Sequence, residues 1–438
     1  MPQRYLIVAM TALASFWLYI DRVCFSTLAR PIKEELLLPH AASPAAADSQ
    51  MSYALGAFFL TYAIFQIPMG SLADRYGARK VLALSIAAWS FVTMVTGFVS
   101  GFVALLAIRL LLGVTEAGAY PAAAGLIKSW VAPGERGRSS AAVTLGGRLG
   151  GAVAPWLTAT LAAALAGAGG LAWLVPQTAG SATAWRGVFV IYGLCGLAVA
   201  ALFWLIVRDR PASTSSGATA TVTDHGFIAR LGILARTANM WNLGILQFCV
   251  NLGWAFIVTL LPTYLAEVFG TPLEKVGAMQ STALAIGCVG MLFGGGFTDF
   301  MLHRLGPRLG RSVPIGLSLA GCAVAFFAVP TLPSAWLVIV ALGAMAFCVD
   351  MHNPPLWSFV QDIGGSNVGT ALGWGNMWGN LGAALSPILL TELRRQGGWN
   401  TAFICCGCAC VIGAICGFML DATRPVEPEA APAKSPGG

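Results

Sequence analysis

The stretch GSLADRYGARK, from Gly70 to Lys80, ends one long apolar run and precedes another. Its polar core holds one acid followed by basic residues, between apolar runs at about 51–70 and 80–100. A stretch of the same pattern, GGGFTDFMLHRLGPRLGR from Gly294 to Arg311, separates the runs at about 276–301 and 312–331. A helix needs about 20 apolar residues to cross the hydrocarbon core of a bilayer. Both stretches therefore predict short loops between membrane-spanning helices.

Twelve apolar runs of spanning length surround these two loops. The runs cover about 5–30, 51–70, 80–100, 102–131, 136–165, 186–207, 241–267, 276–301, 312–331, 334–358, 367–392 and 399–421. The chain is 57% hydrophobic and 10% charged, whereas a soluble domain is about a quarter charged. We therefore expect an all-α membrane protein with twelve transmembrane helices. The repeated loop places six helices in each of two bundles, an arrangement of transporters that bind substrate near the midplane.

The predicted organisation has four parts. Residues 1–207 form an N-terminal six-helix bundle, and 241–421 form a C-terminal one. Residues 208–240 are a Ser/Thr/Gly-rich cytoplasmic linker that includes a short surface helix before Arg236. Residues 422–438 are a Pro/Ala-rich tail, which we expect to be disordered.

The distribution of Lys and Arg predicts the orientation. Sixteen of the 25 basic residues fall in loops on the side of the N-terminus, six fall on the other side, and Arg22, Arg109 and Arg148 lie inside apolar runs. Cytoplasmic loops are enriched in Lys and Arg, so both termini should be cytoplasmic. This distribution also explains the net charge of +7 without a nucleic-acid partner. The first apolar run is too long for a cleaved signal peptide, and the absence of Asn-x-Ser/Thr sequons favours a bacterial inner membrane.

Charged residues inside the apolar runs indicate a polar interior. Asp21 and Arg22 lie in the first run, and Arg109 and Glu116 in the fourth. Such residues are costly at membrane depth, and they usually face a bundle interior or an aqueous path. Arg109 and Glu116 are two helical turns apart, about 10.5 Å along the axis, and so share one stripe. We expect both acids and both arginines to face one cavity.

A desolvated carboxylate can take up and release a proton, whereas an arginine stays charged. The pattern therefore predicts that Asp21 and Glu116 carry protons. Arg109 would pair with one of these acids in one conformational state. A static buried ion-pair network in the N-terminal half is the alternative.

Neither an enzyme nor a cofactor or metal site is expected. The eleven cysteines contain no CxxC pair, and five of them crowd the last apolar run as small buried residues. No Gly-rich nucleotide motif or Ser-His-Asp constellation appears in a loop.

The first loop resembles the signature of the major facilitator superfamily, G-x-L-a-D-r-x-G-r-[RK]-[RK]. Gly70, Asp74, Arg75, Gly77 and Arg79 match it, together with Leu72 and Lys80. The resemblance covers nearly the whole chain and implies the major facilitator fold. We expect these residues, with Asp299 in the second loop, to form a conformational latch made in one state and broken in the other. A solvated turn is the alternative.

Four segments are similar to the anion:cation symporter family, whose bacterial members import sugar acids and other carboxylates with protons. They are LYIDRVCFSTLARPIKEEL, TYAIFQIPMGSLADR, IRLLLGVTEAGAYPAA, and PLWSFVQDIGG with GTALGWGNMWGNLGAALSP. The resemblance implies that Arg22 binds the anion. It also implies polar and aromatic contacts to the rest of the substrate from Tyr19, Tyr62, Trp357 and Asn376.

Two departures from that family concern charge. Arg148 replaces a neutral polar residue; a second cation in the cavity would suit a dianion or a bulkier carboxylate, and pairing with Asp21 or Glu116 is the alternative. Asp350 and His352 form an ionisable pair before Pro354. They are either a second titratable or cation site or, as we expect, a helix-end network near the inner face.

These observations predict a secondary active transporter that carries an organic anion with protons by alternating access. Its partners would be a small carboxylate, protons and the lipid bilayer, with sodium still open as the coupling ion, and we expect a monomer. A proton-driven exporter of drugs or other small molecules fits less well, because the three arginines at membrane depth favour an anion. An anion-sensing receptor without transport is the third possibility, but no signalling domain is attached.

Overall fold

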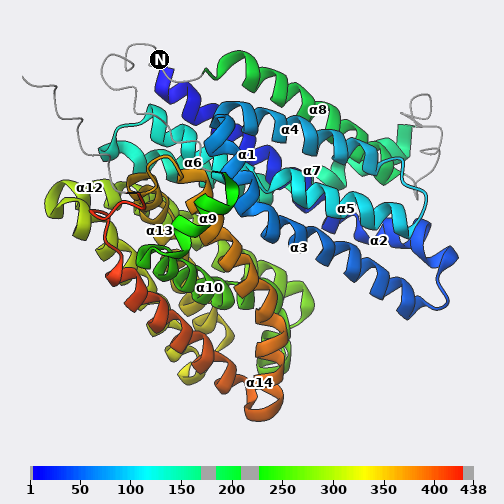
Figure 1. Cartoon of the computed structure of the whole chain (residues 1–438). Helices are drawn as coiled ribbons and strands as arrows, with labels where there is room; N and C mark the ends of the chain where they lie inside the picture. The colour runs from blue at the N-terminus through cyan, green and yellow to red at the C-terminus, as the bar shows by residue number, and fades with distance from the viewer. Residues whose placement is uncertain (1–2, 169–183, 209–225, 428–438) are drawn as a thin grey trace, which may run out of the picture.

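The computed structural model describes residues 3–168, 184–208 and 226–427, and these ranges are helical almost throughout (Figure 1). In the first half the helices are α1 (Gln3–Thr27), α2 (Ala29–Ile32), η1 (Lys33–Leu37), η2 (Leu38–His40), α3 (Pro44–Tyr76), α4 (Ala78–Thr96), α5 (Phe102–Glu116), α6 (Ala119–Trp130), η3 (Pro133–Glu135), α7 (Arg136–Ala168) and α8 (Ala184–Ile206). In the second half they are α9 (Phe227–Ala235), α10 (Ala238–Thr259), α11 (Leu261–Phe269), α12 (Leu273–Ala328), η6 (Val329–Thr331), α13 (Ala335–Ile363) and α14 (Val368–Met419).

Ten helical stretches in the described ranges are long and apolar enough to cross a membrane. Two of them, α12 and α14, contain a residue with non-helical backbone angles, Gly306 (φ 74°) and Gly398 (φ 75°). A positive φ is strained for residues other than glycine, so each glycine allows the chain to turn back on itself. Each long stretch is therefore two spans, and the chain has twelve transmembrane helices.

Some boundaries differ from the expected runs because of local backbone chemistry. The run expected at 102–131 is divided into α5 and α6 near Gly118, and the run expected at 241–267 is divided into α10 and α11 before Pro262. Pro262 lacks the N–H that would continue a helix. The loops expected after 301 and 392 are tight bends within α12 and α14.

The predicted linker and tail lie largely outside the described residues, since 209–225 and 428–438 are not described. The short helix expected before Arg236 is α9, which ends at Ala235.

Large apolar side chains cover the outside of the molecule, as in a protein that is dissolved in lipid. Val103 is 77% exposed, Leu205 75% and Ile388 70%. On a water-soluble monomer, large exposed apolar patches mark interaction sites. Here they occur on helices of spanning length all along the chain, so hydrocarbon is their solvent.

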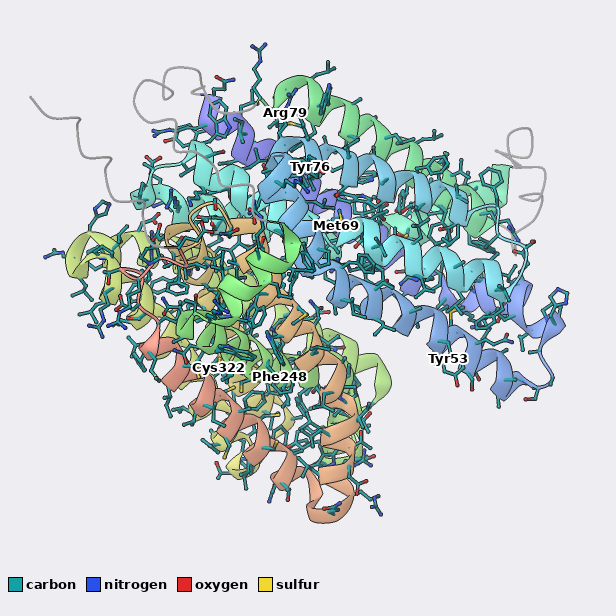
Figure 2. All side chains as sticks on the ribbon, viewed as in Figure 1. Tyr53, Met69, Tyr76, Arg79, Phe248 and Cys322 are labelled. Carbon is teal, nitrogen blue, oxygen red and sulfur yellow. The ribbon has the colours of Figure 1, made fainter. Side chains whose placement is uncertain are left out.

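Two groups of helices, α1 to α8 and α10 to α14, lie side by side and diverge toward one end (Figure 1). They pack together mainly through α3 against α14 and through α7 against α12, with further contacts from α6 and α13. We call the end where they meet the closed face; it carries the α3–α4 turn, the start of α7 and the α13–α14 turn. The other end, the open face, carries α2, the start of α3 and the Gly398 bend. Figure 2 shows Tyr53 near the open end of α3 and Tyr76 near its closed end.

Candidate functional site

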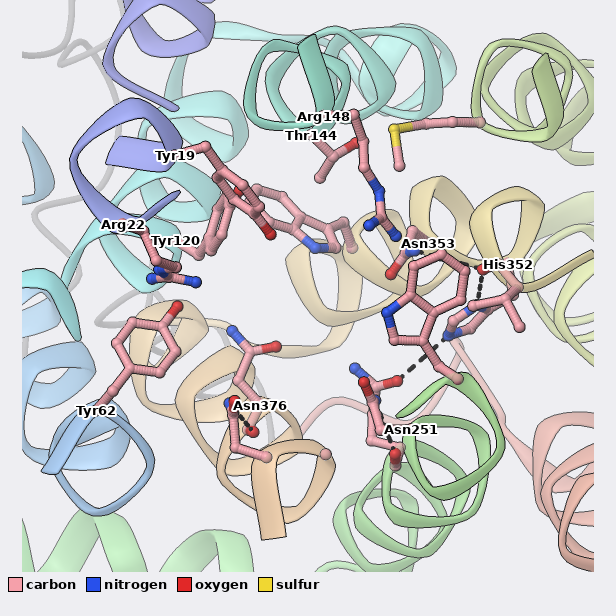
Figure 3. A pocket seen from close by; sticks show the side chains of 17 residues that line it. Tyr19, Arg22, Tyr62, Tyr120, Thr144, Arg148, Asn251, His352, Asn353 and Asn376 are labelled. Atoms are coloured by element: carbon pink, nitrogen blue, oxygen red, sulfur yellow. Dashed lines mark hydrogen bonds between the residues drawn. The ribbon is translucent and has the colours of Figure 1, made fainter. Parts of the chain in front are cut away.

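A cavity of about 190 Å³ lies between the two groups of helices, lined by polar and aromatic side chains (Figure 3). It contains all six residues expected to contact substrate: Tyr19, Arg22, Tyr62, Arg148, Trp357 and Asn376. Eight different helices contribute lining residues, so the cavity exists only where the two groups face each other. A concave site with convergent polar groups is the usual form of a small-molecule site.

Arg22 is positioned by one carboxylate and three aromatic rings. Its Nη2 and Nε atoms donate to Glu116 Oε2 at 2.8 and 3.2 Å. Its guanidinium carbon lies 4.4 Å from the ring centre of Tyr62, 5.1 Å from that of Phe58 and 5.2 Å from that of Tyr19. The Arg22 side chain is 14% exposed, toward the cavity, while the Glu116 side chain is 0% exposed behind it. Cation–π contact and the ion pair together compensate for placing this cation at membrane depth.

The expected pairing of Arg109 with an acid does not occur in this conformation. Arg109 is buried; its Nε donates to the carbonyl oxygen of Ala54, and its guanidinium stacks 4.0 Å from the ring centre of Phe25. The prediction placed Arg109 and Glu116 on one stripe of α5, but Glu116 pairs with Arg22 of α1 instead. Arg109 therefore lies outside the cavity lining.

Asp21 also lies outside the cavity lining, contrary to expectation. Its side chain is buried next to Trp89, within electrostatic range of Glu116. Neighbouring residues on a helix point in different directions, so Arg22 faces the cavity while Asp21 faces the interior of its own bundle.

Arg148 faces the cavity and crosses it to the other half of the molecule. Its Nη2 donates to Asp350 Oδ1 at 2.5 Å, and its guanidinium lies 4.4 Å from the ring centre of Trp254. The alternative pairings of Arg148 with Asp21 or Glu116 are therefore wrong. The expectation that Asp350 and His352 belong to a network near the inner face is also wrong: His352 lines the cavity and its Nε2 lies 3.2 Å from Gln247 Oε1.

Several lining residues have no counterpart in the sequence-based prediction. They are Tyr120, Thr144, Gln247, Asn251, Trp254 and Asn353. Gln247, Asn251 and Trp254 lie at positions i, i+4 and i+7 of one helix, which is the spacing of a single helical face. This polar stripe within an apolar run could have been recognised.

The closed face holds the acids of the two repeated loops. Asp74 accepts hydrogen bonds from the backbone N–H groups of Gly369 and Thr370, both at 2.7 Å. Asp299 accepts from the N–H groups of Gly137 and Arg138 at 2.9 and 3.1 Å. Each acid caps the start of a helix in the opposite half, where unpaired N–H groups and the helix dipole favour a negative charge.

Among the other residues expected in the latch, Gly70 contacts the opposite half. Gly70 packs directly against the backbone of Gly369. Gly77, with φ 97°, lies in the turn between α3 and α4. Arg75 lies over the ring of Tyr76, and Arg79 donates to the carbonyl oxygen of Trp204 at 2.8 Å, so the contacts described for these two stay within the first half.

A buried triad that was not predicted joins the halves at the same face. Asp362 of α13 accepts from Arg136 Nη1 at 2.5 Å and from Arg311 Nε at 2.7 Å. Arg311 also donates to the carbonyl oxygen of Pro133 at 3.0 Å. Arg136 was counted in sequence only as a loop residue that sets orientation.

Comparison with known proteins gives a consistent family. The family described as Major Facilitator Superfamily matches residues 11–387. A probable sulfoacetate transporter of Cupriavidus necator is 28% identical, over 97% of this chain and 95% of the relative. A probable galactarate/D-glucarate transporter of Escherichia coli is 27% identical, over 94% and 93%, and a hexuronate transporter of Bacillus subtilis is 25% identical, over 95% and 94%.

Solved structures share the fold. The fucose:proton symporter of E. coli superposes with a TM-score of 0.69 at 14% identity, over 94% of this chain and 98% of that one. The human organic anion transporter MFSD10 superposes with a TM-score of 0.69 at 16% identity, over 95% and 100%.

Proposed function

Because this chain belongs to the major facilitator superfamily, as a non-enzymatic transport protein of the membrane, we propose that it moves a small organic anion together with protons by alternating access. The observation that carries the proposal is Arg22, a cation at membrane depth whose guanidinium faces the cavity and is backed by a buried acid. The relatives named as transporters of sulfoacetate, galactarate or hexuronate support an anionic substrate.

Arg22 binds an anionic group of the substrate. A guanidinium can pair with a carboxylate through two parallel N–H···O bonds, and the same donors now contact Glu116. Tyr19, Tyr62, Trp357 and Asn376 surround the space beside Arg22 and contact the rest of the molecule. The tyrosine hydroxyls and the Asn376 amide suit a hydroxylated carbon chain.

Glu116 carries the proton. When a substrate carboxylate takes over the donors of Arg22, Glu116 would be left as a buried and unpaired anion, which is strongly unfavourable. Uptake of one proton by Glu116 removes that cost, so anion and proton binding favour each other. Asp21 and Arg109 both lie within electrostatic range of Glu116, so their charges influence how readily Glu116 takes up a proton. Asp21 is a second candidate proton carrier.

The closed face is the cytoplasmic face in this proposal. It carries the basic residues of the repeated loops and the buried Arg136 and Arg311. Both termini are then cytoplasmic, and the conformation described here is open to the outside of a bacterial inner membrane. The protein acts as a monomer, since one chain contains the whole cavity.

The test is uptake of radiolabelled D-glucarate and sulfoacetate into proteoliposomes under an imposed pH step, with a sodium step of equal size as the alternative driver. We expect the wild type to concentrate at least one of these anions in response to the pH step. Glu116→Gln should lose this response and keep exchange of internal for external anion, because Arg22 stays in place.

The matched control is Glu392→Gln, since Glu392 is exposed and its pairs among the described residues are with Arg395 and Gln396 of its own helix. This variant should keep wild-type uptake. Accumulation by Glu116→Gln in response to the pH step would contradict the role of Glu116, and accumulation driven by sodium alone would contradict proton coupling.

A further inference from the structure

The pair between Arg148 and Asp350 differs from the other ion pair of the cavity because it joins the two halves. Arg148 belongs to α7 and Asp350 to α13. The Arg148 side chain is 24% exposed and lines the cavity, while the Asp350 side chain is 1% exposed behind it. The guanidinium is therefore accessible to a ligand from the side that Asp350 does not occupy.

Arg22 and Arg148 face the same cavity from separate positions. Figure 3 shows both guanidinium groups pointing into it, with the Tyr19 side chain between them. Each arginine is backed by a buried acid and stacks on at least one aromatic ring of the lining. Each arginine of the cavity is thus placed to hold one anionic group.

We propose that Arg148 is a second anion subsite, which Asp350 occupies until the second anionic group of a substrate replaces it. The inference rests on the proposed function and narrows its substrate to short dianions, in which two carboxylates, or a carboxylate and a sulfonate, are joined by a short chain. One group binds Arg22 and the other binds Arg148. Asp350 accepts one proton as it leaves Arg148, so a second proton enters with the dianion.

The surroundings of Asp350 are suited to both of its states. Oδ1 is held by Arg148, while Oδ2 is buried and has no hydrogen-bond partner among the described residues. Gly287 of α12 leaves room for Oδ2, since a Cβ there would meet it at 2.6 Å. A buried carboxylate oxygen without a hydrogen-bond donor makes the charged form of Asp350 less stable. Loss of the Arg148 guanidinium would remove its remaining partner and so favour the protonated form.

Few other charged or titratable groups face this pair. Those among the described residues are Cys288 of α12 and Tyr19 of α1. On α13, His352 is turned toward Gln247 of α10 and toward the carbonyl oxygen of Val349. Asp350 is therefore the acid whose charge depends most directly on Arg148.

Both anionic groups would be held by one half of the molecule. Arg22 lies on α1 and Arg148 on α7, whereas Asp350 belongs to the other half. Binding a dianion would break the ion pair that joins the halves inside the cavity. A monoanion held at Arg22 leaves that pair intact, so the two ligand classes differ in their effect on the conformational change.

The test compares two acids that differ at one end of the same carbon chain. D-glucarate has two carboxylates, and D-gluconate has a hydroxymethyl group in place of the second. Dissociation constants are measured on the purified full-length protein at pH 5.5 and 7.5, and the readout is the gluconate-to-glucarate ratio of the two constants. A proton taken up at Glu116 affects both acids and cancels in this ratio.

We expect the wild type to prefer glucarate, with the preference rising toward pH 5.5 by up to about tenfold per pH unit for one proton. Arg148→Gln should raise the dissociation constant of glucarate at least tenfold and change that of gluconate less than twofold. Asp350→Asn should keep the preference for glucarate and lose its pH dependence. The double variant, which contains no unpaired charge, should behave as Arg148→Gln, and Asp48→Asn, at an exposed acid, should behave as the wild type.

Three results would overturn the inference. The first is a wild-type preference for gluconate. The second is an equal loss of affinity for both acids in Arg148→Gln and in the double variant. The third is a pH dependence of the ratio that is unchanged in Asp350→Asn. Binding of gluconate alone leaves the proposed function standing and removes only the second subsite. Failure of glucarate, gluconate and sulfoacetate alike to bind the wild type overturns the substrate class and the proposed function together.

Discussion

Arg22 illustrates how a single cation is stabilised at membrane depth. The Tyr19, Phe58 and Tyr62 rings surround its guanidinium, and Glu116 accepts two hydrogen bonds from it. The planar guanidinium can stack and donate at the same time, which the point charge of a lysine cannot do. The residue type, and not only the charge, is therefore required at this position.

Arg22→Lys tests this argument. We expect the variant to fold, because it keeps a cation opposite Glu116, and to lose at least tenfold in the initial rate of anion uptake. The loss follows from the missing bidentate contact and from weaker stacking, each on the order of 1 kcal/mol. Uptake into proteoliposomes at equal protein content gives the measurement, with Arg30→Lys at an exposed site as the control. Full activity of Arg22→Lys would reduce the role of Arg22 to its charge.

The sequence predicted only part of the cavity lining, and it did not predict which side chains pair with one another. Arg22 and Arg148 were expected in the cavity and line it, whereas Arg109 and Asp21 were expected there too and are buried outside its lining. The partner of Arg109 was missed, because helical spacing fixes the position of a side chain along one helix and says nothing of the neighbouring helix. The carbonyl group of Ala54 and the ring of Phe25 become its partners only through packing.

At the scale of elements, Asp74 and Asp299 act as caps for helices that belong to the other half. Asp74 accepts hydrogen bonds from two backbone N–H groups at the start of α14, and Asp299 accepts two at the start of α7. The repeated loop was recognised in the sequence from its Asp and its basic residues. The capped helices could not be identified, because a cap across two bundles leaves no local pattern such as the Ser43 cap of α3.

Asp74→Ala should destabilise the closed face. It removes the acceptor for two N–H groups and for the Thr370 hydroxyl, and loss of a helix cap costs about 0.5–2 kcal/mol. We expect roughly a two- to thirtyfold increase in opening at this face. The rate at which a thiol reagent added from the closed side modifies a cysteine placed at Thr144 measures the opening, and Asp48→Ala on the same helix is the control. An unchanged rate would show that the cap does not restrain this face.

Gly70 limits how closely α3 and α14 can approach. A Cβ on Gly70 would overlap the carbonyl group of Gly369, which is backbone and cannot rotate away. We therefore expect Gly70→Ala to disfavour the conformation described here more strongly than Asp74→Ala, in the same accessibility measurement. Gly56→Ala is the matched control on the same helix, since a Cβ there meets nothing within 4 Å. Equal accessibility in the two glycine variants would refute this packing argument.

At the scale of the whole molecule, the two halves are held together by polar contacts at one end and by the cavity residues in the middle. The caps, the Gly70 contact and the triad of Arg136, Asp362 and Arg311 all lie at the closed face. The division into two six-helix groups follows from the apolar runs together with the repeated loop. The conformation does not follow from the sequence. The same chain must adopt one conformation open at each face, and the free energies of the two differ by only a few kcal/mol.

The triad predicts how the balance between the arrangements can be shifted. Asp362 is the single acid between two buried arginines, and it has a side-chain exposure of 14%. Asp362→Asn removes the carboxylate that both cations contact, and removing one partner of a buried pair costs on the order of 3 kcal/mol. Because Arg136 and Arg311 lie in different halves, their repulsion acts directly against closure at this face.

We expect Asp362→Asn to move the population toward a molecule that is open at the present closed face and closed at the opposite face. Distances between spin labels at Tyr53 and Arg395, both exposed and near the open ends of α3 and α14, should shorten in this variant. The labels require a background without accessible cysteines, chiefly Cys195 and Cys408. Asp48→Asn serves as the control for the same chemical change at an exposed acid. If the distance distribution of Asp362→Asn matches that of the wild type, the triad does not restrain the two halves against each other.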